Sequence, residues 1–190
     1  MPLKLAAPSW DEIQQSCLEI AAKTKTNGFK PDTIIGVARG GWIPARLIAD
    51  ILGIGSLTSL GISFYTDIAT TEKKPTITQP ITITIEGKVI LMVDDVADTG
   101  HSLKVGRDHV AGLLPRRLKI ATIYKKPWSI ITPDYYTTES DAWIIFPWEQ
   151  AESTRSLNKK LTAEGLSQSE IKRKLLKAGL SQAIVEATLK

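Results

Sequence analysis

The segment VILMVDDVADTG, which begins at Val89, places three carboxylates directly after a run of five apolar residues. The apolar run favours a buried strand, Asp94 and Asp95 follow it at once, and Asp98 precedes a Thr-Gly turn at Gly100. A helix that begins after such a turn presents backbone N–H groups that bind a phosphate, and the carboxylates can accept hydrogen bonds from hydroxyl groups. A ribose 5-phosphate offers both features. Receiver domains and several NTPases also carry two acids after a strand, and such acids can simply cap it, so this segment alone leaves those alternatives open.

Strands and helices alternate along the chain, which predicts an α/β protein built on a parallel sheet. A capping box formed by Ser9 and Glu12 opens a helix that ends at Asn27-Gly28, and further helices are expected at 42–52 and 102–114. The expected strands are 33–37, 57–64, 81–85, 89–93, 118–124 and 142–146. We interpret 81–85 and 89–93 as a hairpin or an antiparallel edge, and the polar segment 66–80, with its two prolines, as a mobile loop.

Several polar residues follow the predicted strands directly. Arg39 comes after one strand, Asp94–Ser102 after another and Lys125 after a third. Because parallel sheets bind ligands outside the carboxyl ends of their strands, we expect these residues to lie close together.

The net charge of +4 is concentrated in the last part of the chain. From Ser153 onward the chain has eight Lys and Arg residues and three Glu residues, a net charge of +5, which leaves −1 for the rest of the chain. A nucleic-acid-binding role for the whole protein is therefore unfavoured. The tail repeats GLSQ at 165–168 and 179–182, and we interpret it as three short helices at 157–164, 168–178 and 182–190.

Composition points to a cytoplasmic protein with one main domain in its 190 residues. No apolar run approaches the roughly 18 residues that a membrane span needs, and no signal-peptide pattern opens the chain. The only cysteine, Cys17, allows no intramolecular disulfide and is expected to be a packing residue.

Three longer motifs carry a resemblance to a known family. The stretch VILMVDDVADTGHSL resembles the signature with which type I phosphoribosyltransferases bind 5-phosphoribosyl 1-pyrophosphate (PRPP), and IIGVARGGWIPA resembles their pyrophosphate loop. The segments IATIYKKPW and DAWIIFPWE resemble the purine-binding side of the 6-oxopurine enzymes, of the xanthine–guanine type and its short archaeal relatives. The resemblance covers Trp10 to Glu152. It implies a phosphoribosyltransferase domain at 1–152, with a small hood over the parallel sheet. It does not cover the tail, which the charge distribution and the GLSQ repeats predict to be a basic helical extension at 153–190.

The resemblance implies a Mg²⁺-dependent reaction of PRPP with a 6-oxopurine (hypoxanthine, guanine or xanthine), giving a nucleoside monophosphate and pyrophosphate in purine salvage. Asp94 and Asp95 would hold the ribose hydroxyls. Mg²⁺ would sit mainly on PRPP, with Asp94 or Asp95 as a possible carboxylate ligand. Asp98 would take the proton from purine N7 as N9 attacks, or would cap the following helix, or both.

Each remaining subsite has its own set of implied residues. The 5′-phosphate would be bound by Asp98, Thr99, Gly100, His101 and Ser102. The pyrophosphate would be bound by Ala38, Arg39, Gly40 and Gly41, with a cis peptide expected at Ala38–Arg39. Lys125 would donate to the purine 6-oxo group, Trp143 would stack on the base, and the carbonyls of Trp143 and Ile144 would face the 2-position. Lys126 would be a solvated loop charge, and Ser63, Phe64 and Tyr65 would work in a lid over 63–80.

Some alternatives stay open. The base could be adenine or orotate, although Lys125 and Trp143 argue against this, since a lysine donor suits a 6-oxo acceptor and not a 6-amino group. The protein could also be a PRPP-sensing regulator that binds nucleic acid without catalysis. The extension could be an oligomerisation arm, a nucleic-acid patch or a solvated helical cap, and we expect that truncation after Glu152 leaves the fold and the active site intact and alters assembly or stability instead. A homodimer is expected from the resemblance.

Overall fold

A computed structural model describes residues 4–66 and 73–189, and contacts divide the chain into two compact units. The first, which we call the sheet unit, is Ile13–Ser140. The second, which we call the helical unit, combines Met1–Glu12 with Asp141–Lys190. The boundary that the sequence predicts after Glu152 falls within a helix, α4 (Gln150–Ala163), and it stays a prediction. None of the helices in the described part of the chain is long and apolar enough to cross a membrane.

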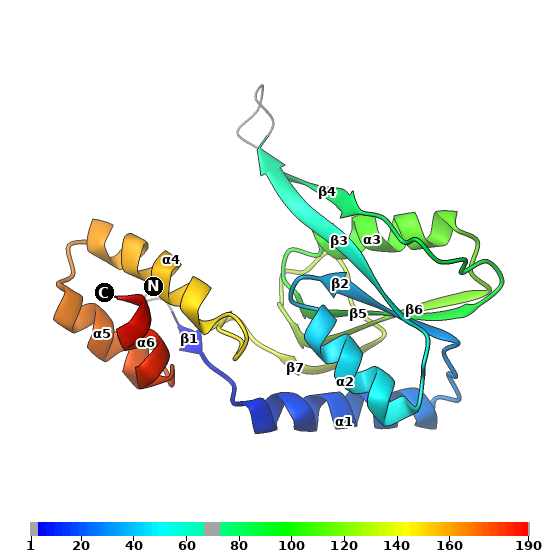
Figure 1. The fold of residues 1–190 in the computed structure, drawn as a ribbon, viewed down its shortest axis with the longest axis horizontal. Coiled ribbons are helices and arrows are strands. Elements are labelled where there is room, and N and C mark those ends of the chain that lie inside the picture. The colour runs from blue at the N-terminus through cyan, green and yellow to red at the C-terminus, as the bar shows by residue number, and fades with distance from the viewer. Residues whose placement is uncertain (1–3, 67–72, 190) are drawn as a thin grey trace. The chain divides into compact units, whose positions relative to one another are not determined.

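The sheet unit is built on six strands in the order β4-β3-β2-β5-β6-β7 (Figure 1). Their bounds are β2 (Thr33–Ala38), β3 (Leu57–Thr66), β4 (Lys73–Gln79), β5 (Val89–Ala97), β6 (Arg117–Lys125) and β7 (Tyr135–Glu139). All neighbouring pairs are parallel except β3 and β4. The predicted α/β class with a mostly parallel sheet is therefore confirmed. The apolar run Val89–Val93 is fully buried because β5 lies in the middle of the sheet, between β2 and β6.

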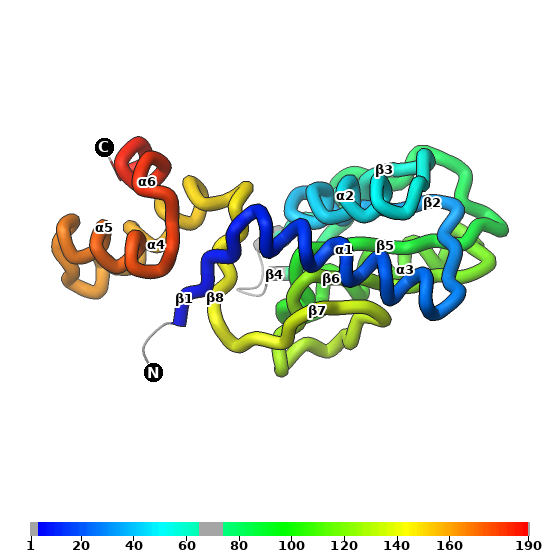
Figure 2. Tube along the Cα trace, turned by 90° about the horizontal axis from the view of Figure 1, so that it is seen from below, coloured from blue at the N-terminus to red at the C-terminus, as the bar shows by residue number. Residues whose placement is uncertain are grey.

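Helices α1 (Trp10–Thr26) and α2 (Trp42–Leu52) cover one face of the sheet, and α3 (His101–Gly112) covers the other (Figures 1 and 2). The capping box of α1 forms as predicted: Ser9 N donates to Glu12 Oε2 at 2.7 Å and Glu12 N donates to Ser9 Oγ at 3.2 Å. Cys17 is buried in the core, and burial raises the pKa of its thiol to about 12. A thiol with so high a pKa is a packing group rather than a nucleophile.

The strand expected at 81–85 does not form, and the loop expected at 66–80 contains β4 instead. Both long sides of β5 are paired with β2 and β6, so the hairpin predicted between 81–85 and 89–93 has no edge to occupy. Ile85 is instead buried in the core on the α3 face, and Ile77 and Ile81 pack against the same cluster. The antiparallel edge is β4, where Pro75 is tolerated because an edge strand has one side without strand partners.

The strand beside β6 is β7, which the sequence analysis missed. The expected strand at 142–146 is reduced to β8 (Trp143–Ile144), which belongs to the helical unit and pairs in parallel with β1 (Leu5–Ala6). The Tyr and Thr residues of YYTTE favour a strand, but the segment is short and has no apolar alternation, and its pairing with β6 fixes it as part of the sheet.

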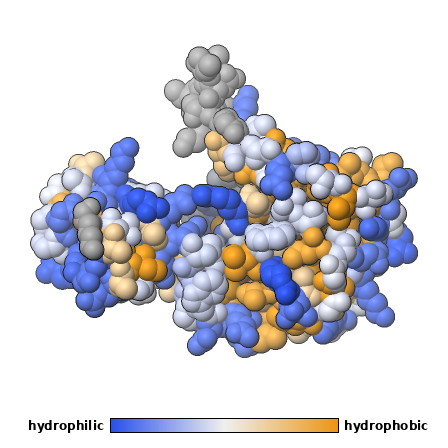
Figure 3. Space-filling view, viewed as in Figure 1, coloured by the Kyte–Doolittle hydropathy of each residue, from blue (hydrophilic) through white to orange (hydrophobic). Residues whose placement is uncertain are grey.

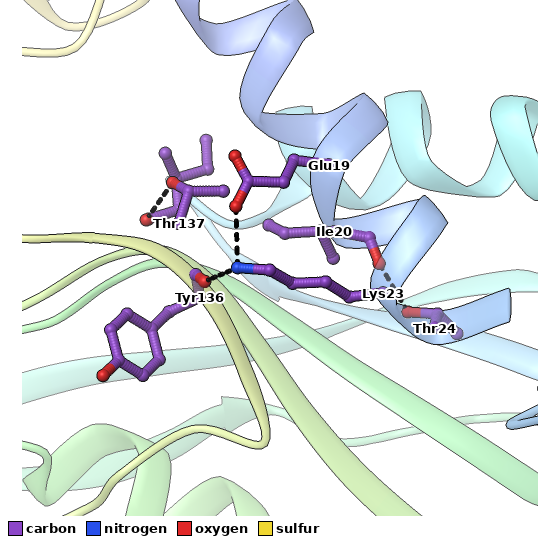
Figure 4. A network of polar contacts seen from close by, with 7 residues as sticks. Glu19, Ile20, Lys23, Thr24, Tyr136 and Thr137 are labelled. Atoms are coloured by element: carbon purple, nitrogen blue, oxygen red, sulfur yellow. Dashed lines mark hydrogen bonds and ion pairs between the residues drawn. The ribbon is translucent and has the colours of Figure 1, made fainter. Parts of the chain in front are cut away.

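The outer edge of β7 is tied to α1 by the contacts drawn in Figure 4. Lys23 Nζ donates to the carbonyl oxygen of Tyr136 at 2.7 Å and forms an ion pair with Glu19 at 2.7 Å. Lys23 is carried by α1, and its bond to a β7 carbonyl places a charged helix residue against this edge strand, which is one way in which proteins protect a sheet edge from pairing with another chain.

The helical unit contains α4, α5 (Gln168–Lys177) and α6 (Gln182–Thr188), and hydrophilic residues cover much of its surface in Figure 3. Each GLSQ repeat joins two helices as predicted. Gly165 and Gly179 have positive φ angles of 88° and 95°, and Ser167 and Ser181 are the N-caps of α5 and α6. The first tail helix starts earlier than expected, at Gln150.

The tail helices share a core with residues that precede them. The buried cluster of the helical unit consists of Ile145, Leu157, Leu161, Ile171, Leu175, Leu180 and Val185, and Leu5 and Ala7 pack against it. The tail supplies most of the core of this unit, which argues against the expectation that its removal leaves the fold intact.

Truncation after Glu152 is expected to destabilise the helical unit rather than leave it intact. Ile145 would lose its buried partners, and exposing one such side chain costs about 1.5–3 kcal/mol. Thermal unfolding should show a transition that is lost or lowered by several degrees. A shorter truncation after Gly179 removes α6 and two members of the buried cluster, Leu180 and Val185, and it should cost less because the rest of the cluster stays. Equal melting temperatures for all three chains would contradict the packing described above.

Candidate active site

The three loops that carry the predicted residues follow adjacent strands, so they meet at one edge of the sheet. They are 38–41 after β2, 98–102 after β5 and 126–131 after β6. The first loop lies directly on the acidic pair. A Cβ added at Gly41 would lie 2.6 Å from both Asp94 Cα and Val93 O, and one at Gly40 would collide with the Asp95 carboxylate. Only glycine fits at these two positions, which allows the backbone to approach the acids closely.

The peptide bond between Ala38 and Arg39 is cis, as the resemblance predicted. The Arg39 residue of this loop is exposed, while Gly41 is buried at the start of α2. The structure therefore brings the expected pyrophosphate loop and the expected ribose acids into contact.

The two acids are half-buried at the end of β5, and each accepts a backbone hydrogen bond. Asp94 Oδ1 accepts from Asp95 N at 3.0 Å, and Asp95 Oδ1 accepts from Val96 N at 2.7 Å. Burial is the main cause that raises the pKa of both carboxyls, and the neighbouring Asp95 charge raises the pKa of Asp94 further. The pKa of Asp95 rises to about 6. The acids are thus costly to ionise without a ligand, which is typical of a functional site.

Asp95→Asn is expected to stabilise the protein at pH 7.5. A carboxyl whose pKa is higher in the folded than in the unfolded state favours folding fully below about pH 4, and this contribution is lost as the pH rises through about 6. The variant should gain about 1–2 kcal/mol in the free energy of unfolding at pH 7.5, but little at pH 4. Denaturant unfolding at both pH values measures this difference.

Asp108 provides a matched control with the opposite sign. Its pKa is lowered, chiefly by a hydrogen bond from Arg107, so Asp108→Asn should slightly destabilise the protein at pH 7.5. An Asp95→Asn protein that is less stable than its parent at pH 7.5 would show that the acid pair is not under electrostatic strain.

The expected phosphate loop ends at Gly100, the N-cap of α3, whose φ of 84° lies in the left-handed region. A Cβ there would lie 2.8 Å from Ser129 Oγ and 2.9 Å from Ile131 N, so glycine is required by both conformation and space. Helix α3 begins at His101, and the N–H groups of its first turn have no partner within the helix. This arrangement suits an anion, as the sequence predicted.

Asp98 is exposed just before the Gly100 turn, and its carboxylate accepts a hydrogen bond from Trp128. The distance from Trp128 Nε1 to Asp98 Oδ1 is 3.0 Å. The alternative that Asp98 caps α3 is wrong, because the N-cap is Gly100 and the side chain that accepts from the first helical N–H, that of His101, is Thr99, at 3.5 Å. Sequence analysis missed Trp128. Its one signal was an aromatic residue two positions after the Lys-Lys pair that ends β6.

The two lysines at the end of β6 have different surroundings. Lys125 Nζ donates to Glu139 Oε2 on the neighbouring strand β7 at 2.8 Å. Lys126 is only 5% exposed, and its Nζ lies 5.7 Å from the centre of the Trp128 ring. The expectation that Lys126 is a solvated loop charge is wrong. Lys126 contacts the same indole that binds Asp98, whereas Lys125 pairs with β7.

The remaining predicted residues are not tested by the geometry. Trp143 and Ile144 form β8 in the helical unit, with Trp143 partly exposed and Ile144 buried, so their purine roles stay predictions. Ser63 and Phe64 are exposed on β3. The side chain of Tyr65 and residues 67–72 of the expected lid lie outside the described residues, and the lid role stays a prediction.

The carboxylate oxygens of Asp94 and Asp95 suit a hard cation, one that takes most of its ligands from the substrate and from water. Within 4–66 and 73–189, no group of three His, Cys, Asp or Glu side chains could enclose a metal ion. Asp94 and Asp95 supply two carboxylates beside the expected pyrophosphate loop. Mg²⁺ is usually bound by one or two carboxylates together with substrate phosphates, so these residues are compatible with it.

The chain belongs to the phosphoribosyltransferase family, because the family model for the phosphoribosyl transferase domain matches residues 9–152. It is 31% identical over 143 residues to a xanthine-guanine phosphoribosyltransferase of Idiomarina loihiensis, covering 74% of this chain and 84% of that one. It is 29% identical over 148 residues to the enzyme of the same name from Gluconobacter oxydans, covering 77% and 85%. Among solved structures, the purine phosphoribosyltransferase from Pyrococcus horikoshii Ot3 is 39% identical with a TM-score of 0.70, covering 77% of this chain and 94% of that one.

Proposed function

We propose that this protein transfers the 5-phosphoribosyl group from PRPP to a 6-oxopurine, giving a nucleoside monophosphate and pyrophosphate in purine salvage. The observation that carries the proposal is the meeting of three loops, 38–41, 98–102 and 126–131, at one sheet edge. The glycine loop 38–41 lies on the acids Asp94 and Asp95, and Asp98 follows these acids in the chain. The relatives named above, which are xanthine-guanine and purine phosphoribosyltransferases, support the same substrates.

In this proposal purine N9 attacks C1′ of the ribose, and the bond from C1′ to the pyrophosphate oxygen breaks. Loop 38–41 and Arg39 receive the departing pyrophosphate through backbone N–H groups and the guanidinium group. Asp94 and Asp95 hold the ribose hydroxyls, which orients C1′, and the start of α3 holds the 5′-phosphate. Asp94 or Asp95 would help to hold Mg²⁺ on PRPP, and the ion would supply positive charge to neutralise the leaving group. Asp98 Oδ2 accepts the proton from N7 while Oδ1 keeps its bond to Trp128.

Lys126 is our preferred donor to the purine 6-oxo group, in place of Lys125. The supporting observation is that Lys126 lies against Trp128, the residue bound to Asp98, whereas Lys125 is paired with Glu139. Since a lysine only donates, it suits a 6-oxo acceptor and disfavours the 6-amino group of adenine. The cytoplasmic setting fits the single buried cysteine. The homodimer and the purine roles of Trp143 and Ile144 stay predictions.

A spectrophotometric assay of PRPP with hypoxanthine, guanine, xanthine and adenine tests this function, with and without Mg²⁺. Turnover of at least one 6-oxopurine, with adenine rejected, is the expected result. Preference for adenine would refute the 6-oxopurine assignment. PRPP binding without turnover of any base, together with a PRPP-dependent gel shift of nucleic acid, would favour the regulator instead.

A further inference from the structure

The loop after β6 is fixed to the backbone on both sides of Asp98. Lys126 N donates to Ala97 O at 2.9 Å, and Ile130 N donates to Thr99 O at 3.1 Å. The loop also closes on itself, because Ser129 N donates to Lys126 O at 3.1 Å. Trp128, midway along this loop, therefore has its backbone held in place relative to Asp98.

The Trp128 side chain contacts two charged groups of opposite sign. Its indole N–H donates to Asp98 Oδ1 at 3.0 Å, and the ring centre lies 5.7 Å from Lys126 Nζ, within cation–π range. Trp128 is 53% exposed as a residue, so it is not a core residue whose position packing alone explains. One rigid ring thus connects the carboxylate and the ammonium group.

In a 6-oxopurine, the O6 and N7 atoms lie next to each other on one edge of the base. A donor to O6 and an acceptor of the N7 proton must therefore be held at a matching separation. We propose that Trp128 is a positioning residue that sets this separation between Lys126 and Asp98, an inference that rests on the proposed function. The N–H group orients the Asp98 carboxylate, and the ring face holds the Lys126 ammonium group.

Two substitutions separate these contributions. Trp128→Phe keeps an aromatic face for Lys126 but removes the N–H donor to Asp98, while Trp128→Ala removes both. We expect Trp128→Phe to lower kcat about tenfold, with the KM for PRPP unchanged within about twofold. Trp128→Ala should in addition reduce the preference for hypoxanthine over adenine, measured as the ratio of kcat/KM values, by about tenfold.

The decisive measurement repeats Trp128→Phe in an Asp98→Asn background. If Trp128 acts through Asp98, the second substitution should lower kcat by less than about twofold there, because residues that act as a unit are non-additive. Trp10→Phe is the matched control, since Trp10 is 54% exposed and lies in the helical unit against Trp148. It should leave kcat unchanged.

Two results would overturn the inference while the proposed function stands. They are an unchanged kcat in Trp128→Phe, or an equal loss of kcat in both backgrounds, in a parent protein that converts 6-oxopurines. A parent that converts no 6-oxopurine would refute the proposed function itself, and this inference with it. Melting temperatures of both Trp128 variants show whether a loss reflects unfolding, and the Phe variant keeps the test valid if the Ala variant is unstable.

Discussion

Asp98→Asn is expected to lower kcat by roughly 10²–10⁴-fold, the usual contribution of a general base, while PRPP still binds. The asparagine has the same size, and its side-chain oxygen can still accept the hydrogen bond from Trp128 Nε1 that the carboxylate accepts at 3.0 Å. It cannot, however, take a proton from N7. Steady-state kinetics with a 6-oxopurine and calorimetric titration with PRPP separate the two effects.

Asp108→Asn provides the comparison for this prediction, because Asp108 is an exposed acid on α3 that pairs with Lys104 and Arg107. Its kcat should equal that of the parent. If Asp98→Asn retains full turnover, Asp98 has no role in proton transfer, and the acids Asp94 and Asp95 would be the next candidates.

Lys126→Met should lower kcat/KM for 6-oxopurines by roughly 10–100-fold and leave the poor activity with adenine almost unchanged. A charge-assisted hydrogen bond contributes about 1.5–3 kcal/mol, and a factor of ten corresponds to about 1.4 kcal/mol. Sites built around such a bond can reject a substrate that lacks the matching group by roughly 10⁴. Methionine keeps the apolar stem of a side chain that is 5% exposed, so the change removes charge without opening a cavity.

Lys125→Met is the matched variant, because it removes the ammonium group of the adjacent residue. Its main loss is the 2.8 Å contact with Glu139, so kcat/KM should change by less than about threefold for every base. If instead Lys125→Met erodes the preference for 6-oxopurines and Lys126→Met does not, the original assignment of Lys125 as the 6-oxo donor is correct.

Local sequence determined the elements and turns that carry the candidate site. Helix α2 begins and ends where the pattern predicted, at Trp42 and Leu52, because Gly53 with its φ of 71° ends it. The apolar run that starts at Val89 favoured a buried strand and the Thr-Gly turn after it favoured a helix start, and both form as predicted. Since parallel strands end at one edge, even the meeting of the glycine loop and the acids followed from the order of elements.

Only the tertiary structure decided which residues contact each other across those elements. Lys125 and Lys126 have the same local signal, and their partners, Glu139 and Trp128, come from separate segments of the chain. The bond from Trp128 to Asp98 spans 30 residues, so no local pattern indicates it. The strand next to β6 was decided in the same way, because the strand propensity of YYTTE does not say which neighbour it pairs with, and its contacts with β6 and with Lys23 of α1 come from distant segments. Backbone propensity and turn chemistry act over a few residues, whereas the contacts that select a lysine, orient a carboxylate or place an edge strand form only when distant segments pack together.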